Sequence, residues 1–431
     1  MKKLFALLVA AMFSATFAQT EISYWLWDSN QAPAYEACAA EFAKTMPDIK
    51  VNVIQQGWDD YWTGITTGFV AGTAPDVFTN HLAKYPEFAA NAQIVDIQPW
   101  IERDGVDKTI YVGGLAELWG RDAAQYGLPK DWDTIALAYN KDMLAAAGIT
   151  EEEMNNLTWN LEDGGTFGEV IAKLTLDGNG NNALSADFDP ENVVQYGFLQ
   201  NGTGGPYGQT EWSCLTNSTG WTHTDGLYAT KYNYDDPRFI GTIQWLADLM
   251  KKGISPSLEE IRGLGSMAMF QGKQGAIRAG GSWEIGDVLK SDFETAFAPI
   301  PAGPEGRKSM FNGLADSIWV GSKHQEEAWQ WLKFASSAAC EEIVGSFAVV
   351  FPAIPSAVDI AVAKRLEQGV NVSAFSDLTK TEGATFLFPV TDYAAQVSDI
   401  MVKAMDRIYL GEGTAADVIP GAAAEVNAVF E

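Results

Sequence analysis

The spacing between apolar residues alternates along the first part of the chain between the period of a strand and the period of a helix. Apolar residues occupy every second position over 22–26, which predicts a half-buried strand, and recur at helical spacing over 35–42. The same change of period predicts a strand at 49–53, a helix at 61–70 and a strand that begins at 76–78. Strands that alternate with helices are typical of an α/β fold, so we expect a mainly parallel sheet covered by helices.

The later part of the chain has fewer strand signals. Helical spacing returns over 328–335 and over 393–410. Residues 177–234 are rich in Gly, Asn, Thr and Trp and have little periodicity, which predicts long loops on a compact scaffold. Because long loops of this kind commonly bind ligands, this stretch is a candidate binding element.

Length and charge narrow the class of protein. A chain of 431 residues with 47% hydrophobic residues has enough apolar material for two domains. Its 56 Asp and Glu against 28 Lys and Arg give a net charge of -28, which argues against a nucleic acid or an anionic membrane as partner. The acidic residues are spread along the chain, which favours a solvated surface over recognition of a cationic substrate.

Residues 1–18 have the three parts of a signal peptide. Two lysines precede the apolar run Leu4–Phe13, and small residues lead to a cleavage site after Ala18. The apolar run is too short to span a bilayer, and no later segment is long enough. The first cysteine is Cys38, so no lipid acceptor follows the run. We therefore expect cleavage after Ala18 and release into the periplasm without a lipid anchor.

Aromatic residues lie beside polar ones at several predicted strand ends and loops. A sugar presents patches of C–H next to hydroxyl groups, so its site combines aromatic faces with directed polar groups. In open α/β sheets, ligands gather at the carboxyl ends of the strands, where the loop after the first strand is expected. The candidates among the 15 tryptophans and their neighbours are Trp27 with Asp28 and Asn30, Trp132 with Asp131, and Trp283 after Gly280 and Gly281.

Motifs of catalysis are scarce. The sequence has no H-E-x-x-H, and only His81, His223 and His324 are available as histidine bases. The stretch after Gly280 lacks the last glycine of a nucleophile elbow, and residues 265–273 lack the spacing of a phosphate-binding loop. These features favour a binding protein. The alternative is a secreted carbohydrate-active enzyme of similar aromatic and acidic composition.

One segment has part of a calcium-loop pattern. Asp177, Asn179 and Asn181 are spaced like oxygen ligands, but Asn182 occupies the place of the usual glycine and Phe188 that of the bidentate glutamate. The alternative is a polar turn in which Asp and Asn side chains cap the backbone. We expect no cofactor, with Ca²⁺ at this loop as the one candidate.

Five segments, in this order, resemble a single family: the extracellular solute-binding proteins that include maltose-binding protein. Together they extend over nearly the whole mature chain, and their combination is more specific than any one of them. The segments are PDIKVNVIQQGWDDYWTGITTGFVAGTAPDVFTN ending at Asn80, LPKDWDTIALAYNKDMLAAAGI from Leu128, MFQGKQGAIRAGGSW ending at Trp283, APIPAGPEG from Ala298 and SKHQEEAWQWLKFAS from Ser322.

The resemblance implies an α/β periplasmic-binding-protein fold of type II. In this fold two lobes, each discontinuous in sequence, are joined by a hinge and hold the ligand in the cleft between them. Matching of segments places one lobe at 19–132 plus 299–336 and the other at 133–298 plus 337–431.

These lobe boundaries decide which cysteines can pair. Cys38 falls in the first lobe, and Cys214 and Cys340 fall in the second. A bond between lobes would block the hinge, so any disulfide is expected to join Cys214 to Cys340, leaving one free thiol. The three cysteines lack the spacing of a zinc site.

The resemblance also assigns residues to the cleft. Lys130 and Asp131 either bind ligand hydroxyls or pair with each other where the chain crosses between lobes. Trp25, Trp62 and Trp245 are expected to pack in the core or on helix faces. The cleft residues that the resemblance implies are Trp27, Asp28 and Asn30 in the first loop, Asn80 and His81 after the third strand, Trp283 as an aromatic platform and Phe351 as an apolar contact from the second lobe.

The resemblance implies the binding component of an ABC importer. Its ligand is expected to be a neutral sugar, a di- or oligosaccharide, which a monomeric protein delivers to the permease subunits in the membrane. A phosphorylated ligand is disfavoured because the cleft segments are short of Arg and Lys, with Lys130 and Arg278 as the exceptions.

Overall fold

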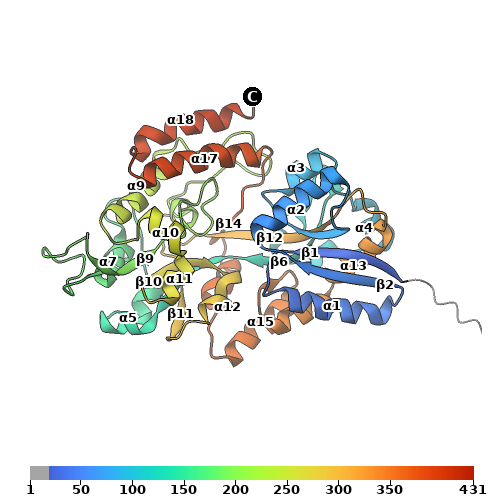
Figure 1. The fold of residues 1–431 in the computed structure, drawn as a ribbon, viewed down its shortest axis with the longest axis horizontal. Helices are drawn as coiled ribbons and strands as arrows, with labels where there is room; N and C mark the ends of the chain where they lie inside the picture. Colours follow the sequence, from blue (N-terminus) through green and yellow to red (C-terminus); the bar gives the residue numbers. More distant parts are fainter. Residues whose placement is uncertain (1–18) are drawn as a thin grey trace, which may run out of the picture.

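The computed structural model describes residues 19–431 and has two lobes, each built on its own β-sheet (Figure 1). The first-lobe sheet has the order β13-β6-β12-β3-β1-β2, with β14 beside β12. Its strands are β1 (Thr20–Leu26), β2 (Ile49–Gln55), β3 (Val77–Asn80), β6 (Leu128–Asp133), β12 (Ser309–Ile318), β13 (Phe351–Pro352) and β14 (Thr385–Leu387).

The second-lobe sheet has the order β11-β7-β10-β9-β8. A separate pair, β4 (Gly120–Arg121) and β5 (Ala124–Gln125), lies between β3 and β6 in sequence. The strands of the second sheet are β7 (Ile135–Asn140), β8 (Leu176–Asp177), β9 (Val193–Leu199), β10 (Gly275–Gly281) and β11 (Thr295–Pro299). These assignments confirm the two-lobed α/β fold.

Helices cover both sheets (Figure 1). Those near the first-lobe sheet are α1 (Ala32–Thr45), α2 (Trp58–Ala71), α3 (Tyr85–Ala90), α4 (Gln98–Asp104), α13 (Gln325–Ala335), α14 (Ala338–Phe347) and α15 (Pro355–Glu367). The others are α5 (Lys141–Ala146), α6 (Glu151–Asn155), α7 (Gly165–Leu174), α8 (Ser213–Asn217), α9 (Pro237–Lys251), α10 (Leu258–Leu264), α11 (Ser266–Gln271), α12 (Ile285–Val288), α16 (Ser373–Ser376), α17 (Ala394–Tyr409) and α18 (Ala415–Ala428).

The first strands and helices form where the apolar periods predict them. β1 and β2 pair in parallel, and α1 between them buries Tyr35, Cys38 and Phe42 on one face. Helix α2 ends at Gly72, whose φ of 73° lies in the left-handed region that favours glycine. The expectation of mainly parallel sheets is wrong, because β7 and β10 pair antiparallel and so do β12 and both of its long neighbours, β3 and β6.

The chain passes between the lobes at short connections. Only Thr134 separates β6 of the first sheet from β7 of the second. The chain returns between β11 and β12, and β14 lies against β12 before the chain enters α17. The strands of the two sheets are therefore joined directly at the boundary, where a cleft can form.

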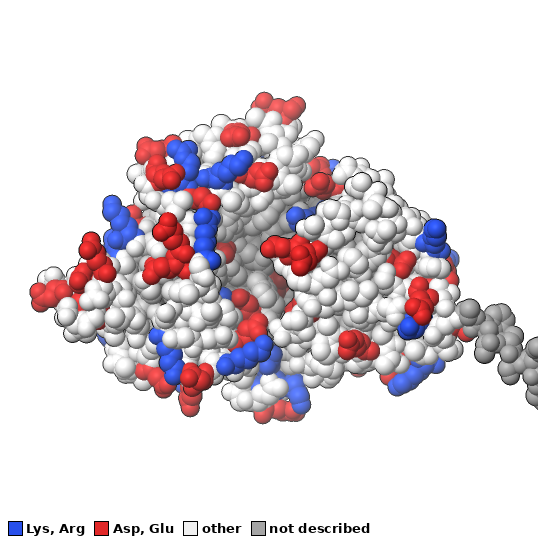
Figure 2. Space-filling model, in the orientation of Figure 1, with Lys and Arg blue, Asp and Glu red and all other residues white. Residues whose placement is uncertain are grey.

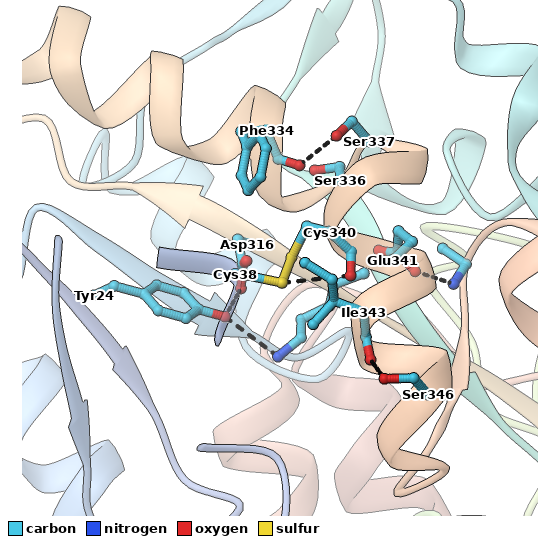
Figure 3. Close-up of a disulfide and its surroundings, with 12 residues drawn as sticks. Tyr24, Cys38, Asp316, Phe334, Ser336, Ser337, Cys340, Glu341, Ile343 and Ser346 are labelled. Atoms are coloured by element: carbon cyan, nitrogen blue, oxygen red, sulfur yellow. Dashed lines mark hydrogen bonds between the residues drawn. A yellow bond between two sulfur atoms is a disulfide. The ribbon is translucent and has the colours of Figure 1, made fainter. Parts of the chain in front are cut away.

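The disulfide differs from the expected one. Cys38 on α1 is bonded to Cys340 on α14, and Cys214 is free and buried (Figure 3). The expected pair of Cys214 and Cys340 was wrong because it rested on placing Cys340 in the second lobe. Helix α14 packs on α1, and β13 pairs with β6, so both elements belong to the first lobe.

The expected placement of 337–431 in the second lobe is also wrong for β14, which pairs with β12 of the first-lobe sheet, whereas the C-terminal helices α17 and α18 pack on α9 in the second lobe. The other lobe boundaries stay predictions. Within residues 19–431, no helix is both long and apolar enough to cross a membrane. The predicted signal peptide, residues 1–18, lies outside the described residues.

Candidate functional site

A cavity of about 460 Å³ lies between the lobes, where the space-filling view shows a hollow (Figure 2). We call it the inner cavity. It has four indole walls, Trp27, Trp58, Trp132 and Trp283, and its other lining residues are Asp28, Ser29, Asn30, Gln31, His81, Asp131, Asp133, Gln209, Asp287, Asn312, Leu314 and Val350.

A second cavity of about 360 Å³ adjoins the inner one. The two share Trp58, His81, Gln209 and Trp283, so we call the second the outer cavity and regard both as one continuous cleft. The residues that line only the outer cavity are Ala83, Lys84, Glu87, Gly204, Tyr207, Thr210, Glu211, Phe388, Ala394, Ala395 and Ser398.

The first-lobe wall of the cleft consists of residues that follow three parallel strands. β1 pairs in parallel with both β2 and β3, so the carboxyl ends of the three strands point the same way. Trp27 follows β1, Trp58 begins the helix after β2, and His81 follows β3. The indole of Trp27 packs edge-on against that of Trp58, with ring centroids 5.1 Å apart. The cleft therefore lies where ligands gather on an α/β sheet.

The loop after β1 is held by Asp28. Its Oδ1 accepts a hydrogen bond from the backbone N–H of Asn30 at 2.8 Å, and its Oδ2 accepts one from Nε2 of Gln31 at 3.1 Å. The Asp28 carboxylate thus fixes the loop that carries Trp27 and Asn30 into the cleft.

β6 supplies the floor of the inner cavity. Trp132 stacks on Phe351 with ring centroids 4.7 Å apart and an interplanar angle of 17°. Asp133 accepts hydrogen bonds from Nε2 of Gln209 at 2.8 Å and from Nδ2 of Asn312 at 3.0 Å. Asp131 is 2% exposed, and its Oδ2 has no hydrogen-bond partner within residues 19–431. The floor therefore holds a carboxylate oxygen that no protein group in the described chain satisfies.

Burial also changes the titration of these carboxyl groups. Burial raises the pKa of Asp133 well above its ordinary value, against the effect of its hydrogen bonds. Burial raises the pKa of Asp131 to about 7, although the positive charge of Lys130 opposes the shift. Asp131 therefore changes its charge near neutral pH.

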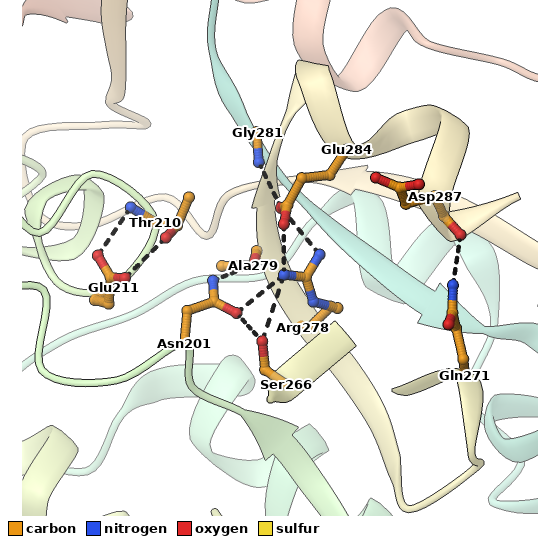
Figure 4. A network of polar contacts seen from close by, with 10 residues as sticks. All are labelled: Asn201, Thr210, Glu211, Ser266, Gln271, Arg278, Ala279, Gly281, Glu284 and Asp287. Carbon is orange, nitrogen blue, oxygen red and sulfur yellow. Dashed lines mark hydrogen bonds and ion pairs between the residues drawn. The ribbon is translucent and has the colours of Figure 1, made fainter. Parts of the chain in front are cut away.

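The second-lobe wall is carried by the turn that ends β10 (Figure 4). Arg278 is 2% exposed, and its guanidinium donates two hydrogen bonds to the carboxylate of Glu284, each at 3.0 Å. Glu284 Oε2 also accepts the N–H of Gly281 at 3.2 Å. A Cβ on Gly281 would lie 1.9 Å from the ring of Trp283, so only glycine lets that ring take its place.

The structure brings most of the predicted cleft residues together. Asn80, Lys130, Gly281 and Phe351 are the exceptions, as they are not among the lining residues. The predicted residues that line the inner cavity are Trp27, Asp28, Asn30, His81, Asp131, Trp132 and Trp283.

The side chains of two of the exceptions lie in the core beneath the first-lobe wall. Asn80 is fully buried and donates from Nδ2 to Oγ of Ser317 at 3.1 Å. Nζ of Lys130 donates to Oγ1 of Thr79 at 3.1 Å and lies 4.1 Å from the ring centre of Tyr35. Neither side chain reaches the cleft, because both turn toward the interior of the first lobe.

The other two exceptions support an indole. Phe351 lies on β13 in the first-lobe sheet behind Trp132, so its expected role as a second-lobe contact was wrong. Gly281 makes room for Trp283 without lining the cavity itself. The expected packing roles of Trp25, Trp62 and Trp245 are confirmed, since Trp62 is buried and the other two pack against the core.

Sequence reasoning missed several lining residues. Trp58 could have been found, because it follows the strand that pairs with β1 and so lies at the same sheet edge. Gln209 lies in an irregular segment, and Asn312 lies within a fully buried strand. No local sequence pattern therefore marks either residue as part of the cleft. Their positions depend on contacts distant in sequence.

The candidate calcium loop has the geometry of the capped turn. Oδ1 of Asp177 accepts the N–H groups of Asn179 and Asn181 at 2.9 and 2.8 Å. Its Oδ2 accepts the N–H of Asp189 at 3.0 Å and Nδ2 of Asn181 at 3.1 Å. Within the described residues, no group of three or more His, Cys, Asp or Glu is placed to hold a metal ion.

A second set of contacts joins the lobes beside the outer cavity. Arg121 donates two hydrogen bonds to the carboxylate of Asp392, at 2.7 and 2.9 Å, and its guanidinium lies 4.5 Å from the ring centre of Tyr228. The hydroxyl of Tyr228 meets that of Tyr85 on α3. We call these four residues the clasp, since Arg121 and Tyr85 belong to the first lobe and Asp392 precedes α17 of the second.

Comparisons with known proteins give a consistent result. A family model described as bacterial extracellular solute-binding protein matches residues 27–339. The arabinooligosaccharide-binding protein of Bacillus subtilis (strain 168) is 24% identical over 345 residues, which cover 75% of this chain and 71% of that protein.

Solved structures agree in fold. Mycobacterium tuberculosis UspC aligns over 95% of this chain and 99% of its own, with a TM-score of 0.73 and 26% identity. The substrate-binding protein Lmo0181 of Listeria monocytogenes, solved with cycloalternan, aligns over 96% of this chain and 99% of its own, with a TM-score of 0.82 and 20% identity.

Proposed function

Because the chain belongs to the bacterial extracellular solute-binding protein family, we propose that it is the substrate-binding component of an ABC importer and holds a sugar between its lobes. The observation that carries this proposal is the inner cavity, where four indoles from both lobes face amide and carboxyl groups. Aromatic faces suit the C–H patches of a sugar ring, and the polar groups suit its hydroxyls. The adjoining outer cavity supports a ligand of two or more rings.

Trp283 provides the test of this proposal. Stacking of a sugar on its indole buries apolar surface worth about 2 kcal/mol. Trp283→Ala is therefore expected to weaken sugar binding about thirtyfold. Titration of tryptophan fluorescence or calorimetry with a panel of sugars measures the loss.

A matched control is Trp100→Ala. Trp100 is a half-buried tryptophan of α4 that lines neither cavity, so its replacement should leave affinity unchanged. If Trp283→Ala destabilises the free protein while the folded fraction binds sugar normally, Trp283 is a packing residue and the site assignment fails.

Ligand binding is proposed to close a hinge between the lobes, since such closure is common for two-lobed binding proteins. The clasp then adds to affinity, because opening of the proposed hinge separates Arg121 of the first lobe from Asp392 of the second. Its ion pair is about one-third exposed, so Arg121→Ala is expected to cost about 1 kcal/mol, or about fivefold in affinity. Unchanged affinity, or an unchanged radius of gyration at saturating ligand in solution scattering, would count against this role.

Membership of the family supports a proposal about the partners and the location of the protein. We propose that the protein acts as a monomer and delivers its ligand to the permease subunits of the importer. Residues 1–18 are proposed to be removed on export, leaving no lipid anchor, and the ligand is proposed to leave the protein chemically unchanged. The relative in Bacillus subtilis is likewise named as a binding protein.

The Asp177 loop is proposed to be a self-capped turn without a bound metal. Its carboxylate already accepts four hydrogen bonds from the loop. Removal of divalent ions with a chelator is therefore expected to leave the melting temperature unchanged. A fall in melting temperature that Ca²⁺ reverses would restore the calcium-loop interpretation.

A further inference from the structure

The acidic and basic side chains that line the inner cavity, His81 apart, are all carboxyl groups. Asp28, Asp131, Asp133 and Asp287 are lining residues, and within the described chain no lining residue is Lys or Arg. His81 adds no positive charge, because burial, and then Lys84, lower its pKa to about 3. This imbalance belongs to the cavity itself and is separate from the acidic surface of the whole chain.

Asp131 differs from the other lining carboxyl groups in having a buried oxygen without a hydrogen-bond partner. Both oxygens of Asp28 and of Asp133 accept hydrogen bonds from neighbouring groups. Asp287 pairs with Lys290 at 2.6 Å. Oδ2 of Asp131 is buried and unpaired within residues 19–431. A buried acceptor without a partner is costly, so a ligand donor that reaches it gains affinity.

The nearest buried cation does not satisfy this oxygen. Lys130 donates hydrogen bonds to the hydroxyl groups of Tyr24 and Thr79 and lies against the ring of Tyr35, and it is not among the lining residues of the cavity. Its positive charge acts on Asp131, Asp316 and Glu341, which are buried together. One ammonium group is thus shared by three buried carboxyl groups, so Lys130 is not a dedicated partner of Asp131.

The walls of the cavity also suit a cation. The faces of the four indoles carry negative electrostatic potential, and cations bind over such faces. On the basis of the proposed function, we infer that the ligand is an amino sugar whose protonated amine binds Asp131 between the indole walls. A neutral sugar offers Asp131 a hydroxyl donor only, whereas a protonated amine also compensates the charge of the carboxylate.

Matched sugars test the inference by fluorescence titration at about pH 6.5, where the carboxylate is partly ionised and sugar amines carry protons. The probes are glucosamine, galactosamine, mannosamine and the β-1,4-linked glucosamine disaccharide. Each is compared with its parent hydroxyl sugar, its N-acetyl derivative and the corresponding uronic acid, and neutral oligosaccharides are included. At least one amine is expected to bind about tenfold more tightly than its parent and its N-acetyl derivative.

Variants locate the effect at Asp131. Asp131→Asn is expected to bring the affinity ratio of amine to parent sugar to within about twofold. Asp60→Asn removes an exposed carboxylate of α2 near Trp58 and should leave the ratio unchanged.

Proton release gives a measurement that needs no variant. An ammonium next to Asp131 stabilises its ionised form and lowers its pKa from about 7. At about pH 6.5, where the sugar amine already carries its proton, amine binding therefore expels a proton. The calorimetric enthalpy should then depend on the ionisation enthalpy of the buffer for the amine and not for its parent sugar. Enthalpies for the amine that are equal in two such buffers overturn the inference, even if Asp131→Asn does not fold.

The outcomes separate the two proposals. If parent sugars or uronic acids bind as tightly as the amines, the inference is wrong and the proposed function stands. If no sugar of the panel binds saturably, neutral oligosaccharides included, the proposed function itself fails.

Discussion

Replacing Cys38 and Cys340 together by Ala is expected to lower the free energy of unfolding by about 4 kcal/mol. The disulfide joins residues 302 positions apart, and a long cross-link removes much of the conformational freedom of the unfolded chain. Urea denaturation followed by circular dichroism measures the loss, and the reduced wild-type protein should match the double variant. Cys214→Ala, which removes the buried free cysteine, is the control and should cost less than about 2 kcal/mol.

This expectation has a clear counter-result. If the double variant lies within about 1 kcal/mol of the oxidised protein, the bond contributes no more than a surface ion pair. The contact of α14 with α1 would then hold the first lobe together by packing alone.

Arg278→Met is expected to cost about 3 kcal/mol in stability. The change leaves the carboxylate of Glu284 without its buried partner and removes the donors that fix the turn before Trp283. Thermal or urea denaturation measures the first effect, and weaker sugar binding by the folded variant reports the second.

The matched control is Arg262→Met. Arg262 pairs with Asp406 at 2.7 Å, but its side chain is 51% exposed, against 2% for Arg278. Water screens such a pair, so its loss should cost no more than about 1 kcal/mol. Equal losses of stability for the two variants would show that the buried Arg278 pair contributes no more than the exposed Arg262 pair.

Local sequence patterns predicted those helices and strands whose formation depends on the spacing of neighbouring apolar residues. The helix period identified the residues that α1 buries, and the alternation of apolar residues located β1 and β2. The site was predictable where it follows those strands: Trp27 and Asp28 come directly after β1.

Positions that depend on distant parts of the chain were not predictable in this way. Cys340 and Phe351 follow the return of the chain from the second lobe, and the sequence around them does not show which sheet they join. Gln209 donates a hydrogen bond to Asp133, 76 positions away in sequence, from a segment that has neither helical nor strand periodicity. Lys130 has the residue type of a ligand-binding group, and only the surrounding Tyr35 and Thr79 show that it packs inward.

The bond between Cys38 and Cys340 also changes the covalent topology of the protein. It closes a ring that contains every strand of the second-lobe sheet, from β7 to β11. A single protease cut in that sheet or in its loops opens the ring but releases no fragment. Two cuts within the ring are needed to detach a piece, so the oxidised protein stays one covalent molecule after a nick that would divide the reduced chain in two.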